Sequence, residues 1–232
     1  MNSEHYDIVI KGTKYLNKWR ETVLNQHVQL DLSGSDLSNL NLENAKLGNA
    51  DLRSADLRNT KLANVNLYMA NLTDANLEGS DMARIKLEKS IIQGANLYNV
   101  NLFWADLNNA TVTSCNLKNS RLMRTSFVGS DLKGSDCSQS TMIEVDFRNA
   151  NLEDVSFRNS NMNGADMSRS VMAGADFSYA MLRDSHWIMA NMIGADYTNA
   201  SLYRVDMTMA KFDETTIFPE GFDPTYSPAD DY

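Results

Sequence analysis

The sequence predicts an all-β solenoid with four sides to each coil, and three observations predict it. Every fifth position from Leu32 to Phe212, 37 in all, is apolar, without an insertion or deletion. The position two residues before each, from Ser35 to Ala210, is Ala or Ser in 26 of 36 cases. Asparagine two residues after the apolar position recurs in one register of 20 residues, at Asn39, Asn59, Asn99, Asn119, Asn159 and Asn199. Residues 20 apart should therefore stack, and these asparagines are expected to form a ladder up one edge.

A five-residue step suits neither regular secondary structure. In an α-helix it rotates about 140°, which would scatter the leucines around the cylinder. In a continuous strand it would place successive leucines on opposite faces. We therefore expect an extended segment of about three residues, with the small and the large side chain inward and Asp or Asn outward, followed by a two-residue bend. The repeat then gives about nine four-sided coils and a rod about 45 Å long, at about 4.8 Å per coil.

The inward positions predict the core of the rod. The first ten are all leucine, whereas the later ones include aromatic residues and seven methionines. Packing variation without a functional role is the simplest interpretation of this change. The predicted core residues include Leu52, Leu57, Leu62, Leu67, Leu72, Leu77, Phe147, Phe157, Phe177, Trp187 and Tyr197.

Both ends of a solenoid need a cap, because its last coils leave apolar core and backbone groups bare. Residues 1–30 are predicted to be the N-terminal cap. A short amphipathic helix is expected within residues 13–25, with its apolar stripe at Tyr15, Leu16, Trp19 and Val23. The repeat domain is predicted over 31–217. Residues 218–232 contain all three prolines and are predicted to be an acidic C-terminal cap or tail.

The repeat units ADLRS, ADLRN, ANLTD and ANLEG resemble those of the pentapeptide repeat proteins over about 180 residues. The resemblance implies a right-handed quadrilateral β-helix. The segment YLNKWRETV is also similar to N-terminal caps of bacterial, especially cyanobacterial, members of that family. Some members bind DNA gyrase or topoisomerase IV, partly by resembling duplex DNA in shape and charge. A DNA-mimicking inhibitor or protector of these enzymes is therefore one function that the resemblance implies.

The location of the charge weighs against that function. The chain carries a net charge of -9, but residues 31–212 have 17 Lys or Arg and 21 Asp or Glu, a balance of -4. Residues 213–232 contribute six acidic residues and no basic one. A DNA mimic needs an acidic surface along the rod, and basic clusters such as Arg84, Lys86 and Lys89 interrupt it. Direct nucleic-acid binding is also disfavoured, since the acidic chain has no continuous basic groove.

The sequence predicts no catalytic, cofactor or metal site. His5 and His27 precede the repeats, and His186 takes an outward position that favours a solvated imidazole. Cys115 and Cys137 have no metal-ligand spacing, and we expect two free buried thiols. No phosphate-binding loop, dinucleotide motif or nucleophile elbow is present. No run is long enough to span a membrane, and the N-terminus lacks a secretory pattern, so we expect a cytoplasmic, non-enzymatic protein.

Most corner residues of the predicted rod are polar, but one corner carries large apolar side chains. In the 20-residue register Trp104 lies between two arginines, and large apolar residues occupy the neighbouring column. Trp and Arg often dominate binding energy, and exposed apolar clusters mark contact sites. We expect a protein partner to bind at Arg84, Phe103, Trp104, Met123, Arg124 and Ile143. Three alternatives stay open: shielding of neighbouring coils, an Arg–Trp–Arg stack, and a homodimer contact. A second apolar cluster comprises Ile188, Met189, Tyr203 and Met209.

Overall fold

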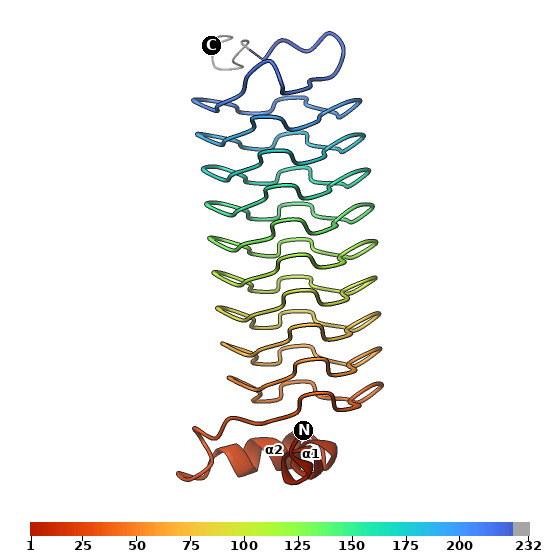
Figure 1. Ribbon diagram of the computed structural model, residues 1–232, viewed down its shortest axis with the longest axis vertical. Coiled ribbons are helices and arrows are strands. Elements are labelled where there is room, and N and C mark those ends of the chain that lie inside the picture. Colours follow the sequence, from red (N-terminus) through yellow and green to blue (C-terminus); the bar gives the residue numbers. More distant parts are fainter. Residues whose placement is uncertain (225–232) are drawn as a thin grey trace.

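Backbone bridges join each outward residue of the repeat to the residue 20 positions later. They run from Asp31↔Asp51 to Asn191↔Lys211, all parallel, and a final bridge joins Asp196 to Ile217. The computed structural model, which describes residues 1–224, therefore has four sides to each coil, as predicted (Figure 1). The predicted tail extends to residue 232, and its part from 225 onward lies outside the described residues.

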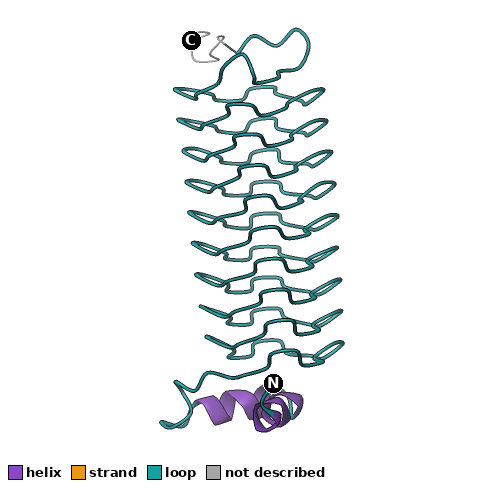
Figure 2. Cartoon of the chain, viewed as in Figure 1, coloured by secondary structure: helices purple, strands orange, loops and turns teal. Residues whose placement is uncertain are grey.

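Each side of a coil contributes a single bridged residue, so residues 1–224 contain isolated bridges rather than named strands (Figure 2). The chain has no room for a longer strand because a corner follows within two residues. The backbone groups are nevertheless paired: Leu57 donates its N–H to the Asn76 carbonyl (2.7 Å), and Asn76 donates to the Ala55 carbonyl (2.9 Å). Bonds of this kind pair the buried backbone of successive coils.

The corners depend on a left-handed backbone conformation. The second corner residue has a positive φ at every step from Gly34 to Met209, between 54° and 74°. The turn closes through bonds such as that from the Ala55 N–H to the Leu52 carbonyl (3.0 Å). Glycine and asparagine adopt a positive φ at lower cost than other residues, which explains their frequency here.

The expected ladder of corner asparagines is wrong. Among residues 1–224 the amide-to-amide bonds run instead up the middle of one side, from Asn96 to Asn76 (3.1 Å) and from Asn116 to Asn96 (3.2 Å). The six asparagines of the expected ladder instead supply the left-handed backbone of their corners, with φ between 55° and 60°. The corner column is also interrupted, for example by Gly79. The 20-residue register was right, but the ladder lies at the outward position, where successive side chains lie one above another.

The inward side chains form one continuous core. The residues of the predicted core set, from Leu52 to Tyr197, are at most 1% exposed. In the later coils the rings stack on one another, with centroids 4.9 Å apart for Phe157 and Phe177 and 4.9 Å for Phe177 and Tyr197. Phe218 continues the stack over Tyr197 at 5.8 Å. Phe218 therefore extends the aromatic column beyond Tyr197 and covers that end of the core.

Two polar atoms of this aromatic core, the Tyr197 hydroxyl and the Trp187 indole nitrogen, are buried without a hydrogen-bond partner among residues 1–224. Burial raises the pKa of Tyr197 well above its ordinary value. We expect Tyr197→Phe to stabilise the rod by about 1 kcal/mol, because a buried unsatisfied hydroxyl is costly. The urea midpoint measures the change, and Tyr179→Phe, at an exposed ring, is the control. A lower midpoint would instead show that a buried water pairs the hydroxyl.

Cys115 and Cys137 are free and buried, as predicted. The Cys115 thiol donates to the Ile92 carbonyl (3.0 Å). Burial raises its pKa to about 12, and burial raises the pKa of Cys137 as well. Since the thiolate is the reactive form, we expect Ellman's reagent to label neither cysteine in the folded protein and both in guanidinium. Rapid labelling of the folded protein would contradict this picture of a closed core.

Two helices cover the N-terminal end of the rod: α1 (Ser3–Ile10) and α2 (Thr13–Arg20). Helix α2 falls within the predicted helical segment, whereas α1 was not predicted. Leu16 is buried, but Tyr15 is 47% exposed and Val23 is 80% exposed, so the predicted apolar stripe is half wrong. The helix ends before Val23, which lies in the following turn. Within residues 1–224 neither helix has the length and apolar character needed to cross a membrane.

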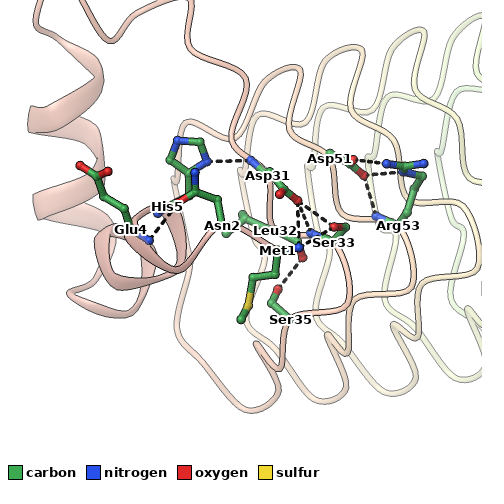
Figure 3. A network of polar contacts seen from close by, with 10 residues as sticks. All are labelled: Met1, Asn2, Glu4, His5, Asp31, Leu32, Ser33, Ser35, Asp51 and Arg53. Carbon is green, nitrogen blue, oxygen red and sulfur yellow. Dashed lines mark hydrogen bonds and ion pairs between the residues drawn. The ribbon is translucent and has the colours of Figure 1, made fainter.

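Helix α1 is joined to the first coil by polar contacts (Figure 3). The Asn2 side chain caps the helix by accepting from the Glu4 N–H (3.0 Å). The Asp31 N–H donates to Nδ1 of His5 (3.0 Å), and Asn2 donates its own N–H to the Asp31 carbonyl (3.1 Å). These bonds pair the backbone of the first coil, which has no coil before it.

Arg20 joins α2 to the rod from a buried position, at only 7% exposure. Its guanidinium donates to the carbonyls of Asn25 (3.2 Å), Val28, Lys46 (3.3 Å) and Gly48 (3.5 Å). Burial lowers the pKa of this side chain. Arg20 thus connects the helix, the turn after it and the part of the first coil around Lys46 and Gly48.

Candidate partner-binding surface

Backbone bonds stack the corners that carry the predicted surface residues. The Arg84 N–H donates to the Phe103 carbonyl (2.8 Å), and the Trp104 N–H donates to the Met123 carbonyl (3.1 Å). The Arg124 N–H continues the column to the Ile143 carbonyl (3.0 Å). We call the resulting corner the Trp104 surface: Arg84, Phe103, Trp104, Met123, Arg124 and Ile143.

Trp104 is the most prominent side chain of this surface. Its ring is 53% exposed and lies 6.2 Å from the Phe103 ring at an angle of 47°. The Arg124 guanidinium lies 5.9 Å from the Trp104 ring centroid, and its Nε donates to Glu144 at 2.7 Å. The hydrogen bond to Glu144 raises the pKa of Arg124, so the guanidinium stays charged. Trp104 therefore has an apolar ring and a cation as neighbours, while about half of the residue remains exposed.

The structure bears on two of the alternatives left open by the sequence. Phe103, Met123 and Ile143 are half-buried, so part of their apolar area does shield neighbouring coils. The Arg–Trp–Arg stack is half formed: within residues 1–224 Arg124 makes a cation–π contact with Trp104, but Arg84 does not. Neither the shielding of neighbouring coils nor the contact with Arg124 buries Trp104 or Arg84, and both residues remain exposed.

The second apolar cluster is also on the surface. Met189, Tyr203 and Met209 are 44%, 59% and 69% exposed, and Ile188 is half-buried. Arg183 lies over the Tyr203 ring at 5.0 Å. The described part of the C-terminal segment packs on the core through Phe218 and Phe222 and leaves these side chains exposed.

A recess of about 450 Å³ lies between the turn after α2 and the early corners of the rod. Its lining residues are Arg20, Gln26, His27, Val28, Gly48, Asn49, Asn66, Tyr68 and Met69. The amine of Lys89 lies 3.4 Å from the Tyr68 hydroxyl. The sequence shows Tyr68 and Met69 as apolar residues at polar corner positions. It does not show the recess, because the turn after α2 forms one of its walls.

The outward histidine of the repeats keeps the neighbours that the 20-residue register gives it. His186 lies between Asp166 and Asp206 as the register predicts, each one bridge away. In residues 1–224 no three His, Cys, Asp or Glu side chains are grouped so that they could hold a metal ion. What the arrangement offers is a surface of exposed aromatic and cationic side chains on a fixed backbone.

Comparison with known proteins shows which family and which solved structures the chain resembles. The family described as pentapeptide repeats matches the chain in 8 copies, over residues 31–67, 70–109, 101–136, 120–159 and 150–186. No curated protein matches the chain. The crystal structure of HetL, a pentapeptide repeat protein involved in heterocyst differentiation regulation from the cyanobacterium Nostoc sp. strain PCC 7120, is 31% identical, with a TM-score of 0.70. The match covers 81% of this chain and 86% of HetL.

A more distant likeness is to QnrB1, a plasmid-mediated fluoroquinolone resistance protein. A trypsin-treated form is 17% identical, with a TM-score of 0.48, over 78% of this chain and 90% of that one.

A four-sided β-solenoid with a filled core, one helical cap and variable side chains at its corners belongs to the class of repeat scaffolds. Within that class the family is clear, since the matched residues and the likeness to HetL agree. The chain belongs to the pentapeptide repeat family.

Proposed function

We propose that this protein is a non-enzymatic scaffold that binds another protein through the Trp104 surface. The observation that carries the proposal is the exposed Trp104 ring beside Arg124 and Arg84, on a backbone fixed by hydrogen bonds above and below. Trp and Arg are the residue types most often responsible for binding energy. A rigid backbone also reduces the entropy lost on association.

The similarity to HetL supports a regulatory role for such a scaffold, since HetL is described as involved in the regulation of heterocyst differentiation. We infer a regulatory role of that kind for this chain, carried out by binding another protein in the bacterial cytoplasm. Cyanobacteria are the first group in which to search for that partner. The alternative is that a second copy of this chain binds the same surface and forms a homodimer.

The gyrase-directed alternative gains less support. Several outward carboxylates of the rod are paired with arginines of their own coil, as in Asp51–Arg53 (2.6 Å) and Asp146–Arg148 (2.6 Å). Such pairs neutralise the acidic surface that a DNA mimic needs. We expect an excess of this protein to leave gyrase inhibited by ciprofloxacin in a supercoiling assay. Restored supercoiling would favour the alternative.

Affinity capture from the source cytosol tests the proposal. The bait is the full chain, compared with the double variant Trp104→Ala/Arg124→Ala. The matched control is Arg158→Ala/Tyr179→Ala, which removes another arginine–aromatic pair (4.9 Å) at a different corner. We expect at least one captured protein to be lost with the first variant and retained with the second. If the first variant retains every captured protein, the assignment of this surface is wrong.

A further inference from the structure

We propose that the Trp104 surface, together with the cationic coils around it, binds an acidic protein segment that carries large apolar side chains. This inference rests on the proposed function and adds the chemistry of the partner. It concerns four half-coils that the bridges place one above another, residues 61–69, 81–89, 101–109 and 121–129. We call them the cationic face.

The cationic face has the opposite charge to the rest of the chain. It holds six Lys or Arg and three Asp or Glu, a net charge of +3 in a protein of net charge -9. All six cationic side chains are exposed. They are Lys61, Arg84, Lys86, Lys89, Arg121 and Arg124.

Most of these cations have no acidic partner in the fold. Within residues 1–224 only Arg124 of the six forms an ion pair, with Glu144 at 2.7 Å. Elsewhere on the rod arginines and lysines are commonly paired, as in Arg58–Asp56 (2.5 Å) and Lys133–Glu153 (2.8 Å). Unpaired exposed cations gathered on one face attract carboxylates of a partner and exclude basic partners.

Large apolar side chains lie among these cations. Met69 and Trp104 are 52% and 53% exposed, and Tyr68 is 37% exposed. Met69 and Trp104 also adopt positive φ values of 57° and 59°, where glycine or asparagine would cost less. The recess of about 450 Å³ opens beside Tyr68 and Met69. The face thus offers places for apolar anchors between the cations, which favours a segment that combines carboxylates with aromatic or aliphatic residues.

The dimensions fit a short segment. Three steps between coils rise about 14 Å, a length spanned by roughly four extended residues or nine helical ones. A nucleic acid fits less well, because three acidic side chains interrupt the six cations and the chain as a whole repels a polyanion. The same repulsion acts against an anionic membrane.

Panning a random dodecapeptide display library on the full chain tests the inference without knowledge of the natural partner. We expect enrichment of acidic peptides with aromatic or aliphatic residues. The enriched peptide, measured by fluorescence anisotropy, should bind at least about tenfold more weakly to Arg84→Glu/Lys86→Glu. The control Arg158→Glu/Arg169→Glu makes the same change in net charge outside the cationic face and should leave binding within about twofold.

Several results would overturn the inference. The panning could enrich no peptide, or it could enrich neutral or basic peptides. The control variant could lose as much peptide affinity as Arg84→Glu/Lys86→Glu. Duplex DNA or phosphatidylserine vesicles could bind more tightly than the peptide, through Arg84 and Lys86. The capture experiment distinguishes failure of this inference about the partner's chemistry from failure of the proposed function. If the Trp104→Ala/Arg124→Ala variant loses a partner while the panning result is negative, the binding surface stands and only the partner's chemistry is wrong.

Discussion

Replacement of Arg20 by alanine is expected to lower the free energy of unfolding of the N-terminal coils by about 3–5 kcal/mol. The guanidinium is the shared donor to four backbone carbonyls and is almost fully buried. Each carbonyl left unpaired costs about 1–3 kcal/mol, and partial access of water to the vacated site offsets some of that sum. The contact of helix α2 with the rod at Lys46 and Gly48 should therefore weaken, with the Asn17 bonds to Asn44 and Lys46 left to hold it.

Hydrogen exchange measures this effect locally. In Arg20→Ala we expect faster exchange at the amides of residues 28–51, with the later coils unchanged, because each coil contacts only its neighbours. The control Lys18→Ala removes an exposed cation from the same helix and should leave exchange as in the parent chain. Unchanged exchange in Arg20→Ala would show that the other contacts of the cap, including the Asn17 bonds to Asn44 and Lys46, hold the rod without Arg20.

Replacement of Phe157 by alanine is the second large effect that we expect. Its ring is fully buried and lies 5.6 Å from Phe147 and 4.9 Å from Phe177, measured between centroids. Loss of a buried phenylalanine side chain costs about 3–5 kcal/mol through lost apolar transfer and a residual cavity. The surrounding coils cannot collapse into the cavity, because their bridges fix the spacing.

The urea midpoint of unfolding measures the effect of this substitution. Phe157→Leu keeps most of the volume and should cost less than about 1.5 kcal/mol. Equal losses for alanine and leucine would show that the stacked rings contribute through their aromatic contacts more than through their volume.

The solenoid could be predicted because its rule is local and repeated. A five-residue repeat of apolar positions excludes a regular helix and a continuous strand. The 20-residue register then determines which residues stack, including the neighbours of Trp104 and His186. The same register misplaced the asparagine ladder, since the ladder depends on where a side chain points. At a corner such as Asn59 the left-handed backbone is the feature that matters, whereas at Asn96 the amide faces the coils above and below.

The cap could be predicted only in part because it depends on tertiary contacts. Helix α1 has eight residues, too few for a clear periodic pattern, and is held by Asn2 and His5 against the first coil. The role of Arg20 depends on carbonyls from the turn and from the corner near Gly48, which no spacing in the sequence reveals. The recess beside Tyr68 escaped prediction for the same reason.

The central claim is that the core of this rod specifies its shape and the outward corners carry its function. Calorimetric titration of the captured partner tests this most directly when two variants are compared with the parent chain. We predict that Trp104→Ala/Arg124→Ala weakens binding by about 30-fold or more, as expected for a contact worth about 2 kcal/mol, with an unchanged urea midpoint. Phe157→Leu should lower the midpoint and leave the affinity unchanged. Full affinity in the Trp104 variant, or lost affinity in the folded Phe157 variant, would contradict the claim.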